Sequence, residues 1–189
     1  MNYTLLAALA AALLLPGCKR PSAEEYYGEA KMLEQETRQV VDTLRDRSRI
    51  PQMFAPVIAH YSKVFEEYPN SPLAETSMMR VAGMLNDDAG EPARAIAMYN
   101  RYLATYPQGA GAPRAMFLIG YLYNNSLHEL DSASTAYQRF LDRFPQDELA
   151  LSARFELNTL GKSPEELLPD TSAAEKESAK KTVAQRRRK

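Results

Sequence analysis

Apolar residues recur three and four positions apart over most of residues 23–160, which is the spacing of amphipathic helices with one buried face. Three fragments of this pattern return at intervals of 38 residues: YSKVFEEYPNS from Tyr61, YNRYLATYPQG from Tyr99 and YQRFLDRFPQD from Tyr137. In each fragment an aromatic residue precedes a proline. Proline ends a helix because it lacks the N–H donor and clashes with the preceding turn. Each fragment therefore predicts the last turns of a helix.

A second helix is predicted after each of these prolines. Its apolar positions are Ala74, Met78, Val81, Ala82 and Leu85 after the first proline, and Ala112, Ala115, Met116, Ile119, Gly120 and Tyr123 after the second. The repeating unit is therefore a helical hairpin. Because one hairpin cannot bury its apolar face alone, consecutive hairpins stack into a solenoid. We predict an all-α fold.

The two ends of the array depart from the repeat. Residues 23–47 predict one long helix, which we interpret as the first helix of the first hairpin; Pro51 opens the next helix. An oligomerising coil is the alternative for this first helix, since positions 26, 30, 33, 37, 40 and 44 follow a heptad. At the other end, Arg154 and Asn158 stand where the preceding hairpin has apolar or small residues, which predicts a capping helix with a polar face.

The hairpins resemble the tetratricopeptide repeat, whose second helix carries a small residue, an aromatic residue four later and a proline eight after that. The matching triplets are Val57, Tyr61 and Pro69; Ala95, Tyr99 and Pro107; and Ala133, Tyr137 and Pro145. Gly120 and Tyr123 match the glycine and tyrosine of the family's first helix. The resemblance implies a tetratricopeptide-like helical hairpin solenoid over residues 23–160, with about three hairpins plus a capping helix. The long period is similar to that of envelope tetratricopeptide lipoproteins of the BamD and CpoB type.

The N-terminus predicts a targeting segment. Thr4 to Leu15 form an uncharged Ala/Leu block of secretory length, too short for a membrane span. Leu15-Pro16-Gly17-Cys18 resembles the lipobox of bacterial lipoproteins, which implies a signal peptide at 1–17, lipid attachment at Cys18 and a lipidated tether at 18–22. An ordinary cleaved signal peptide and a buried N-terminal helix are the alternatives. Lys19 is not the aspartate that retains lipoproteins in the inner membrane of enteric bacteria, so the resemblance implies an outer-membrane lipoprotein of the bacterial envelope that faces the periplasm.

The C-terminus is basic, although the whole chain has a net charge of −1. Residues 161–189 are rich in Ser, Pro, Glu, Lys and Ala and lose apolar periodicity after Leu168, so we expect a disordered basic tail. Its final Arg186-Arg187-Arg188-Lys189 is either solvated or in contact with an anionic lipid or polymer. We do not expect nucleic acid as a partner outside the cytoplasm.

Residues that could carry chemistry lack partners at useful spacing. Gly109-Ala110-Gly111 has neither the Lys-Ser/Thr of a phosphate loop nor a preceding strand, and it predicts an inter-repeat turn. His60, His128 and the single cysteine do not form a metal-ligand pattern, and Asp87-Asp88 lacks calcium-loop spacing. We therefore expect no catalytic residues, no metal and no cofactor, and the chain is not predicted to be an enzyme.

The expected function is that of a lipid-anchored scaffold or adaptor for envelope proteins or peptide segments, with outer-membrane protein assembly as the first candidate. A coordinator of cell-wall synthesis or Tol-Pal-type machinery and an accessory subunit of an envelope enzyme are the alternatives. An oligomer is not favoured. By the family's rule, first-helix residues one step away from the packing positions line a protein-binding groove, and here they are Thr76, Met79, Asn86, Arg114, Phe117, Tyr121 and Asn124. The alternative for Phe117 and Tyr121 is that they simply cover the neighbouring helix.

Overall fold

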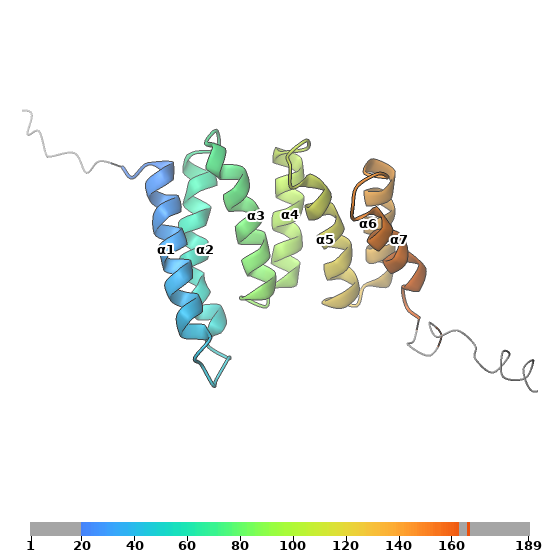
Figure 1. The fold of residues 1–189 in the computed structure, drawn as a ribbon, viewed down its shortest axis with the longest axis horizontal. Coiled ribbons are helices and arrows are strands. Elements are labelled where there is room, and N and C mark those ends of the chain that lie inside the picture. Colours follow the sequence, from blue (N-terminus) through green and yellow to red (C-terminus); the bar gives the residue numbers. More distant parts are fainter. Residues whose placement is uncertain (1–19, 163–165, 167–189) are drawn as a thin grey trace, which may run out of the picture.

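The computed structural model describes residues 20–162 and residue 166. Its main part is a row of helices joined by short turns (Figure 1). Within the described residues seven α-helices and no strands are found: α1 (Ala23–Val41), α2 (Ile50–Glu67), α3 (Pro72–Asp87), α4 (Pro92–Thr105), α5 (Ala112–Asn125), α6 (Leu130–Arg143) and α7 (Ala150–Thr159). The predicted signal peptide, Cys18 and nearly all of the predicted basic tail lie outside these residues.

Each helix packs mainly against the next one along the chain. The pairs α1–α2, α3–α4 and α5–α6 form three antiparallel hairpins, and α7 follows as a single helix (Figure 1). α1 also touches α3, which places the first helices of neighbouring hairpins on the same side. This arrangement confirms the all-α hairpin solenoid predicted from the 38-residue repeat.

The second helix of every hairpin ends in the same way. Tyr68, Tyr106 and Phe144 are the C-cap residues of α2, α4 and α6, with φ between −131° and −123° and ψ between 55° and 65°. A proline follows each of them, and the residue before a proline avoids the helical region for steric reasons. The aromatic–proline step therefore ends the helix as predicted.

Hydrogen bonds along one edge link successive hairpins. The Tyr106 hydroxyl donates to the carbonyl of Pro69 at 3.2 Å, and the Arg143 guanidinium donates to the carbonyl of Pro107 at 2.5 Å. Each bond thus spans about one repeat, from the end of one second helix to the proline of the hairpin before it. The proline both stops its own helix and offers an acceptor to the next hairpin.

The segment from Gly109 to Gly111 forms the predicted turn between α4 and α5, and a tyrosine fixes it. The Tyr102 hydroxyl accepts a hydrogen bond from the Gly111 N–H at 3.0 Å and donates to Glu75 at 2.5 Å. A β-carbon on Gly109 would lie 2.5 Å from that hydroxyl. Glycine is favoured here because the Tyr102 hydroxyl and the Glu75 carboxylate lie directly over the backbone.

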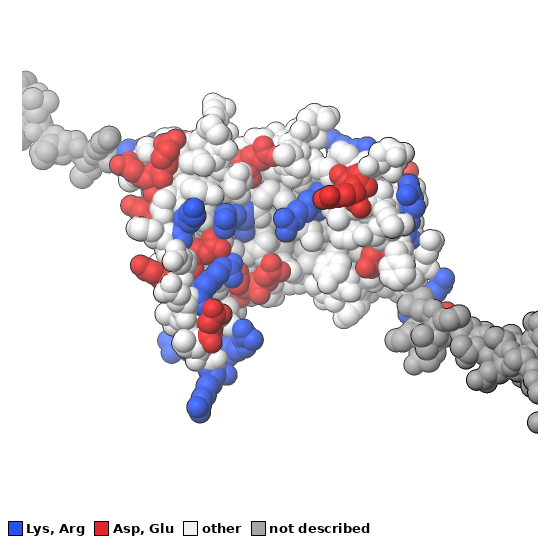
Figure 2. Space-filling view, viewed as in Figure 1, with Lys and Arg blue, Asp and Glu red and all other residues white. Residues whose placement is uncertain are grey.

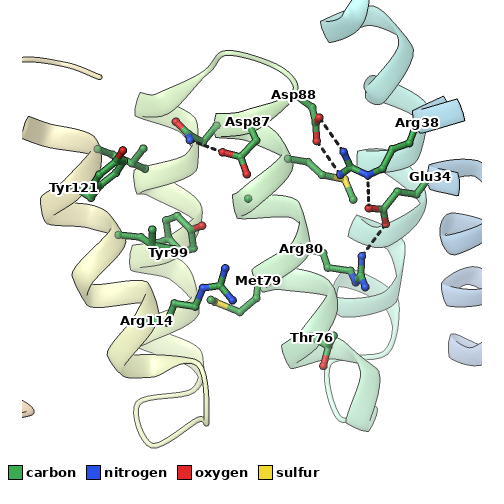
Figure 3. A pocket seen from close by; sticks show the side chains of 15 residues that line it. Glu34, Arg38, Thr76, Met79, Arg80, Asp87, Asp88, Tyr99, Arg114 and Tyr121 are labelled. Atoms are coloured by element: carbon green, nitrogen blue, oxygen red, sulfur yellow. Dashed lines mark hydrogen bonds and ion pairs between the residues drawn. The ribbon is translucent and has the colours of Figure 1, made fainter. Parts of the chain in front are cut away.

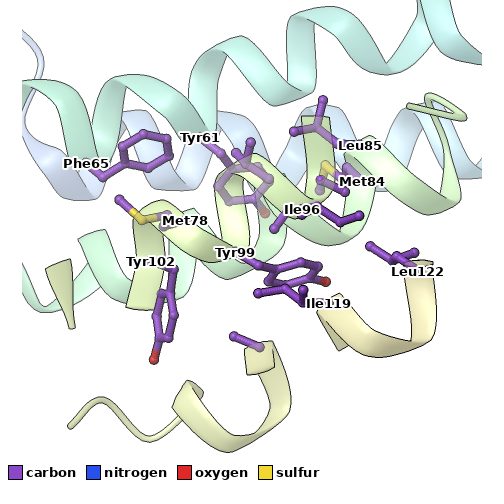
Figure 4. Packing of buried hydrophobic residues seen from close by; sticks show 14 of the residues in the cluster. Tyr61, Phe65, Met78, Met84, Leu85, Ile96, Tyr99, Tyr102, Ile119 and Leu122 are labelled. Carbon is purple, nitrogen blue, oxygen red and sulfur yellow. The ribbon is translucent and has the colours of Figure 1, made fainter. Parts of the chain in front are cut away.

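The core runs continuously from the first hairpin to the third. Figure 4 shows Tyr61, Met78 and Tyr99 among the side chains that fill the space between successive hairpins. Tyr61 and Tyr137 are fully buried and Tyr99 is 4% exposed. Since the three tyrosines are equivalent in the repeat, their common burial confirms the register deduced from the sequence.

The turns inside the second and third hairpins share one backbone path. The Glu91 N–H donates to the Leu85 carbonyl at 2.7 Å, and 38 residues later the Glu129 N–H donates to the Tyr123 carbonyl at 2.8 Å. The turn requires one residue with positive φ. Glycine fills this place in the second hairpin (Gly90, φ 67°), whereas His128 fills it in the third (φ 56°).

Two predictions about the ends of the array need correction. α1 ends at Val41 rather than at residue 47, because the Asp42, Thr43 and Leu44 N–H groups bond back to the carbonyls of residues 38, 40 and 41 and close the last turn. Val40 is 48% exposed, so the buried stripe follows the helical period instead of the heptad.

The second correction concerns α7. Arg154 and Asn158 are exposed, as a polar cap requires, but Leu151 and Phe155 are exposed as well. The outer face of α7 is therefore less polar than the sequence predicted.

Candidate functional site: a groove between α1, α3 and α5

A groove of about 460 Å³ lies on the side of the array formed by the first helices of the hairpins. Its residues come from α1, α3 and α5, with Tyr99 of α4 between them, as Figure 3 shows. α3 contributes most of the lining, since it stands between the other two first helices. The stacking of three hairpins therefore creates the groove, and no single hairpin contains it.

Most of the residues predicted for a binding groove meet here. Thr76, Met79 and Asn86 of α3 and Arg114 and Tyr121 of α5 all line it. That these residues bind a partner stays a prediction, since the structure contains no partner.

Phe117 and Asn124 do not line the groove. The Phe117 ring packs on the rings of Tyr137 and Phe140, with centroids 5.6 and 6.0 Å away, and thus covers the neighbouring helix α6. The Asn124 side chain donates a hydrogen bond to Glu156 of α7 at 3.2 Å. Phe117 thus faces α6 of its own hairpin and Asn124 faces α7, because both lie further around α5 than Arg114 and Tyr121.

A buried carboxylate organises the α1 side of the groove. Glu34 is 8% exposed and accepts three hydrogen bonds: from Arg38 at 3.1 Å, from the Tyr61 hydroxyl at 2.9 Å and from Arg80 at 2.8 Å. The donors come from α1, α2 and α3. A buried charge is tolerated only when it is paired and hydrogen-bonded, so this one ties the three helices together at one point.

Asp88 extends this network at the end of α3. Its two carboxylate oxygens accept from both terminal nitrogens of Arg38, at 3.2 and 3.3 Å. Burial alone would lower the pKa of Arg38, but the hydrogen bonds that Arg38 donates to Glu34 and Asp88, together with their negative charges, outweigh it, and the net shift is upward. The Arg38 side chain therefore remains charged and is fully engaged on this wall.

The opposite wall carries a cation without a protein partner. Arg114 of α5 makes no hydrogen bond or ion pair with any residue in the described part of the chain. Asp87 lies across the groove and is bonded to the neighbouring Asn86 amide at 2.7 Å. Burial and then the charge of Asp87 raise the pKa of Tyr99 to about 12, whereas Arg114 acts in the opposite direction. Tyr99 is thus neutral at physiological pH and lies between the negative charge of Asp87 and the positive charge of Arg114.

Gly83 leaves part of the groove empty. A β-carbon built on this residue of α3 would meet no atom within 4 Å. The space above it is bordered by apolar side chains, among them Met79 and Leu118, and by Tyr121, which is 41% exposed. The groove therefore combines open apolar area with one unpaired cation.

The charged residues on this face are unevenly distributed. Figure 2 shows Lys, Arg, Asp and Glu side chains gathered over α1 and α3, while the lower part of α5 is mostly uncharged. The loop after α1, which carries Arg45, Arg47 and Arg49, projects beyond the helices (Figures 1 and 2). Side chains that approach the groove therefore meet mixed charge on the α1 side and, apart from Arg114, mostly apolar surface on the α5 side.

Sequence reasoning missed Glu34, Arg80 and Gly83. Arg80 lies four residues after Thr76, and Gly83 lies four residues after Met79 and three before Asn86, so a wider stripe on the same helix face would have included both. Glu34 could not be found in this way, because α1 lies outside the aligned repeats and a glutamate on a helix is usually exposed.

The described residues contain neither a metal-binding cluster nor a membrane-spanning helix. Among residues 20–162 and 166, no three His, Cys, Asp or Glu side chains are grouped so that they could hold a metal ion. None of the described helices is both long enough and apolar enough to span a bilayer.

A family model for the tetratricopeptide repeat matches residues 77–109 and 114–147. Residues 77–147 carry two tetratricopeptide repeats. The matches cover most of the second and third hairpins, whereas α1, α2 and α7 lie outside them. A search of curated proteins found no match to the chain. Tetratricopeptide repeats indicate a scaffold that binds other proteins or peptides, and the fold is typically non-catalytic.

Proposed function

We propose that this tetratricopeptide-repeat protein is a lipid-anchored scaffold of the bacterial envelope that receives a segment of a partner protein in the groove between α1, α3 and α5. The observation that carries the proposal is the pairing of Arg114, which has no partner among the described residues, with the open apolar space above Gly83. Solenoids of this kind use the extended surface created by stacking for binding.

The chemistry of the groove defines the segment that fits it. An apolar side chain fills the space above Gly83 and contacts Met79 and Tyr121, and a carboxylate next to it pairs with Arg114. Arg38 and Arg80 are already engaged by Glu34, so Arg114 is the arginine of this groove left to contribute a new ion pair. Aromatic residues and arginine are the side chains that most often dominate binding energy.

The cellular setting of the proposal comes from the N-terminal sequence. Leu15-Pro16-Gly17-Cys18 supports lipidation at Cys18 and attachment to the outer membrane on the periplasmic side. Outer-membrane protein assembly is the pathway that we propose first. The alternatives are a coordinator of cell-wall or Tol-Pal-type machinery and an accessory subunit of an envelope enzyme. The partner found in the crosslinking experiment below would distinguish these roles.

Filling the groove tests the binding role without touching the core. Gly83→Phe would place a ring in the open space, and Gly83→Ala is the matched control because a β-carbon meets nothing there. A photo-crosslinking residue at position 121 is introduced into both variants and the parent in native cells, and the crosslinked proteins are identified by mass spectrometry. We expect the parent and Gly83→Ala to crosslink the same envelope protein and Gly83→Phe to lose it. Equal crosslinking of a folded Gly83→Phe would contradict groove binding.

The lipid anchor needs a separate experiment. Cells are labelled with a fatty-acid analogue, and the parent is compared with Cys18→Ser. We expect label only on the parent and recovery of the parent in the outer-membrane fraction. Equal labelling of both chains would contradict lipidation, and recovery in the inner membrane would contradict the proposed location.

A further inference from the structure

α7 stands in the array as the first helix of a fourth hairpin. Ala150 and Ala153 are buried as Ala112 and Ala115 are, 38 residues earlier in α5. In the earlier hairpins a second helix covers the outer side of the first one. Within the described residues no such helix covers α7.

The absence of this helix leaves an aromatic side chain uncovered. Phe155 is the repeat equivalent of Phe117, whose ring is packed by Tyr137 and Phe140 of α6. Phe155 itself is 61% exposed, and Leu151, one turn earlier on the same face, is 76% exposed. The face that α6 covers on α5 is thus open on α7.

On this face α7 carries a charged residue at a position where α5 has an apolar one. Arg154 stands at the place of Met116, which packs in one cluster with Ala133 and Phe140. Arg154 donates a hydrogen bond to the Pro145 carbonyl at 3.2 Å and makes no ion pair in the described part of the chain. An apolar helix identical to α6 would leave this charge unpaired, whereas a helix with a carboxylate opposite Arg154 would pair it.

The chain's own continuation is poorly suited to cover this face. In the 38-residue register, residues 168–181 correspond to α6, and they place Glu175 and Ser178 where α6 has Tyr137 and Phe140. Neither side chain supplies apolar area for Phe155. A second copy that paired α7 with α7 would bring a second Arg154 to this face and no carboxylate opposite the first, so it is also disfavoured.

We propose that α7 is a docking helix for an amphipathic helix of a partner protein, which binds as the missing second helix of the fourth hairpin. The partner helix carries two apolar or aromatic side chains one turn apart against Phe155 and Leu151, and a carboxylate against Arg154. This site lies at the end of the array and is independent of the groove. The hairpin α5–α6 supplies its template, since the same helix face is covered there.

A peptide built on that template is the probe. It has the sequence of residues 130–143 with Ala133→Glu, so that a carboxylate faces Arg154, and a staple on its outer side holds it helical. The control peptide has serine at the places of Tyr137 and Phe140. Binding to the full chain is followed by fluorescence anisotropy. We expect saturable binding of the first peptide and none of the control.

Variants of the full chain locate the binding site. Since both side chains are exposed, Phe155→Ser and Leu151→Ser should fold normally, and we expect each to weaken peptide binding at least about tenfold. Arg154→Glu should weaken the glutamate peptide more than a peptide that keeps alanine there. Gly83→Phe, which fills the groove, should have no effect. The absence of saturable binding, or binding that Phe155→Ser leaves unchanged, would overturn the proposal.

Two further measurements test the other occupants. We expect the chain to be a monomer by light scattering, and a dimer that Phe155→Ser dissociates would assign the face to a second copy. We also expect deletion of residues 163–189 to leave peptide affinity unchanged. A gain of about tenfold after deletion would show that the chain's own C-terminus occupies the face, and would overturn the proposal.

Discussion

Tyr61 of the first hairpin and Tyr137 of the third hold equivalent places in the repeat, yet their rings meet different surroundings. The Tyr61 hydroxyl donates to Glu34, which also binds two arginines. The Tyr137 ring packs against Phe117, and its buried hydroxyl lies near Glu156 without a hydrogen bond of ordinary geometry in the described part of the chain. The repeat therefore fixes the position of the ring but not the chemistry around it.

The difference shows how a repeat array can vary while keeping its shape. The polar cluster around Glu34 joins three helices through directional bonds, and it is stable only while every member is present. The aromatic cluster around Tyr137 depends on shape, and it requires close contact with α5 at Gly120, where an added β-carbon would lie 2.8 Å from the ring. The cluster around Glu34 should thus be sensitive to loss of charge, and the contact between α5 and Tyr137 should be sensitive to added volume.

Removing the buried carboxylate should have the largest effect. Glu34→Ala leaves Arg38, Arg80 and Tyr61 without their common acceptor, and we expect the free energy of unfolding to fall by about 3–5 kcal/mol. Urea unfolding followed by circular dichroism measures the change. Glu29→Ala, on the exposed side of the same helix, should cost less than about 0.5 kcal/mol. Similar losses of unfolding free energy in both variants would mean that the cluster around Glu34 does not stabilise the packing of α1, α2 and α3.

Removing one tyrosine hydroxyl from each cluster tests the difference between them directly. Tyr61→Phe deletes a hydrogen bond to a buried charge and should lower the free energy of unfolding by about 1.5–3 kcal/mol. Tyr137→Phe should change it by less than about 0.5 kcal/mol, because the hydroxyl that it removes lies near Glu156 but has no hydrogen bond of ordinary geometry within the described residues. Chemical denaturation of the two variants side by side gives the comparison. An equal loss of unfolding free energy in both variants would mean that the two hydroxyls contribute equally to stability.

Adding one carbon to Gly120 should weaken the packing of α5 against Tyr137. Gly120→Ala forces its β-carbon against the fully buried Tyr137 ring, and we expect a net loss of about 1–2 kcal/mol in the free energy of unfolding. Gly83→Ala makes the same substitution inside a helix where the β-carbon meets nothing, and it should gain up to about 1 kcal/mol. Melting temperatures that move in the same direction would show that helix propensity, not contact with Tyr137, decides the outcome at Gly120.

The hairpin turns should give the smallest effect. His128 has a positive φ that disfavours any residue with a β-carbon, so His128→Gly should stabilise the chain by about 0.5 kcal/mol after the entropy of the unfolded glycine is subtracted. Gly90→Ala, at the equivalent turn, should destabilise by about 1 kcal/mol. Calorimetry resolves both shifts. A loss of stability in His128→Gly would mean that the histidine side chain has a role of its own in the turn.

The sequence predicted the helices best where the repeat marks them. The aromatic–proline steps located the ends of α2, α4 and α6, because proline acts on the backbone locally. The end of α1 was misplaced because no proline follows it, and Leu44 prolongs the apolar spacing beyond the last turn. Local signals were sufficient wherever the backbone itself forbids continuation.

The groove was harder to predict than the helices. Phe117 and Tyr121 are one turn apart on α5, yet Phe117 packs on α6 and Tyr121 lines the groove. A spacing of four residues places two side chains on one face, but only the position of the neighbouring helix decides which of them is covered. Glu34 shows the same limit, because its partners are 27 and 46 residues away along the chain.

The bonds that link each hairpin to the preceding proline also determine where the chain can change its length. Tyr106 and Arg143 reach back to the carbonyls of Pro69 and Pro107, so an extra residue in either inter-repeat turn would move the acceptor away from its donor. The loop between α1 and α2 carries no such link, and most of it is exposed. Insertions, tags and evolutionary length variation should therefore concentrate between Thr43 and Arg49, while the turns after Pro69 and Pro107 keep a constant length.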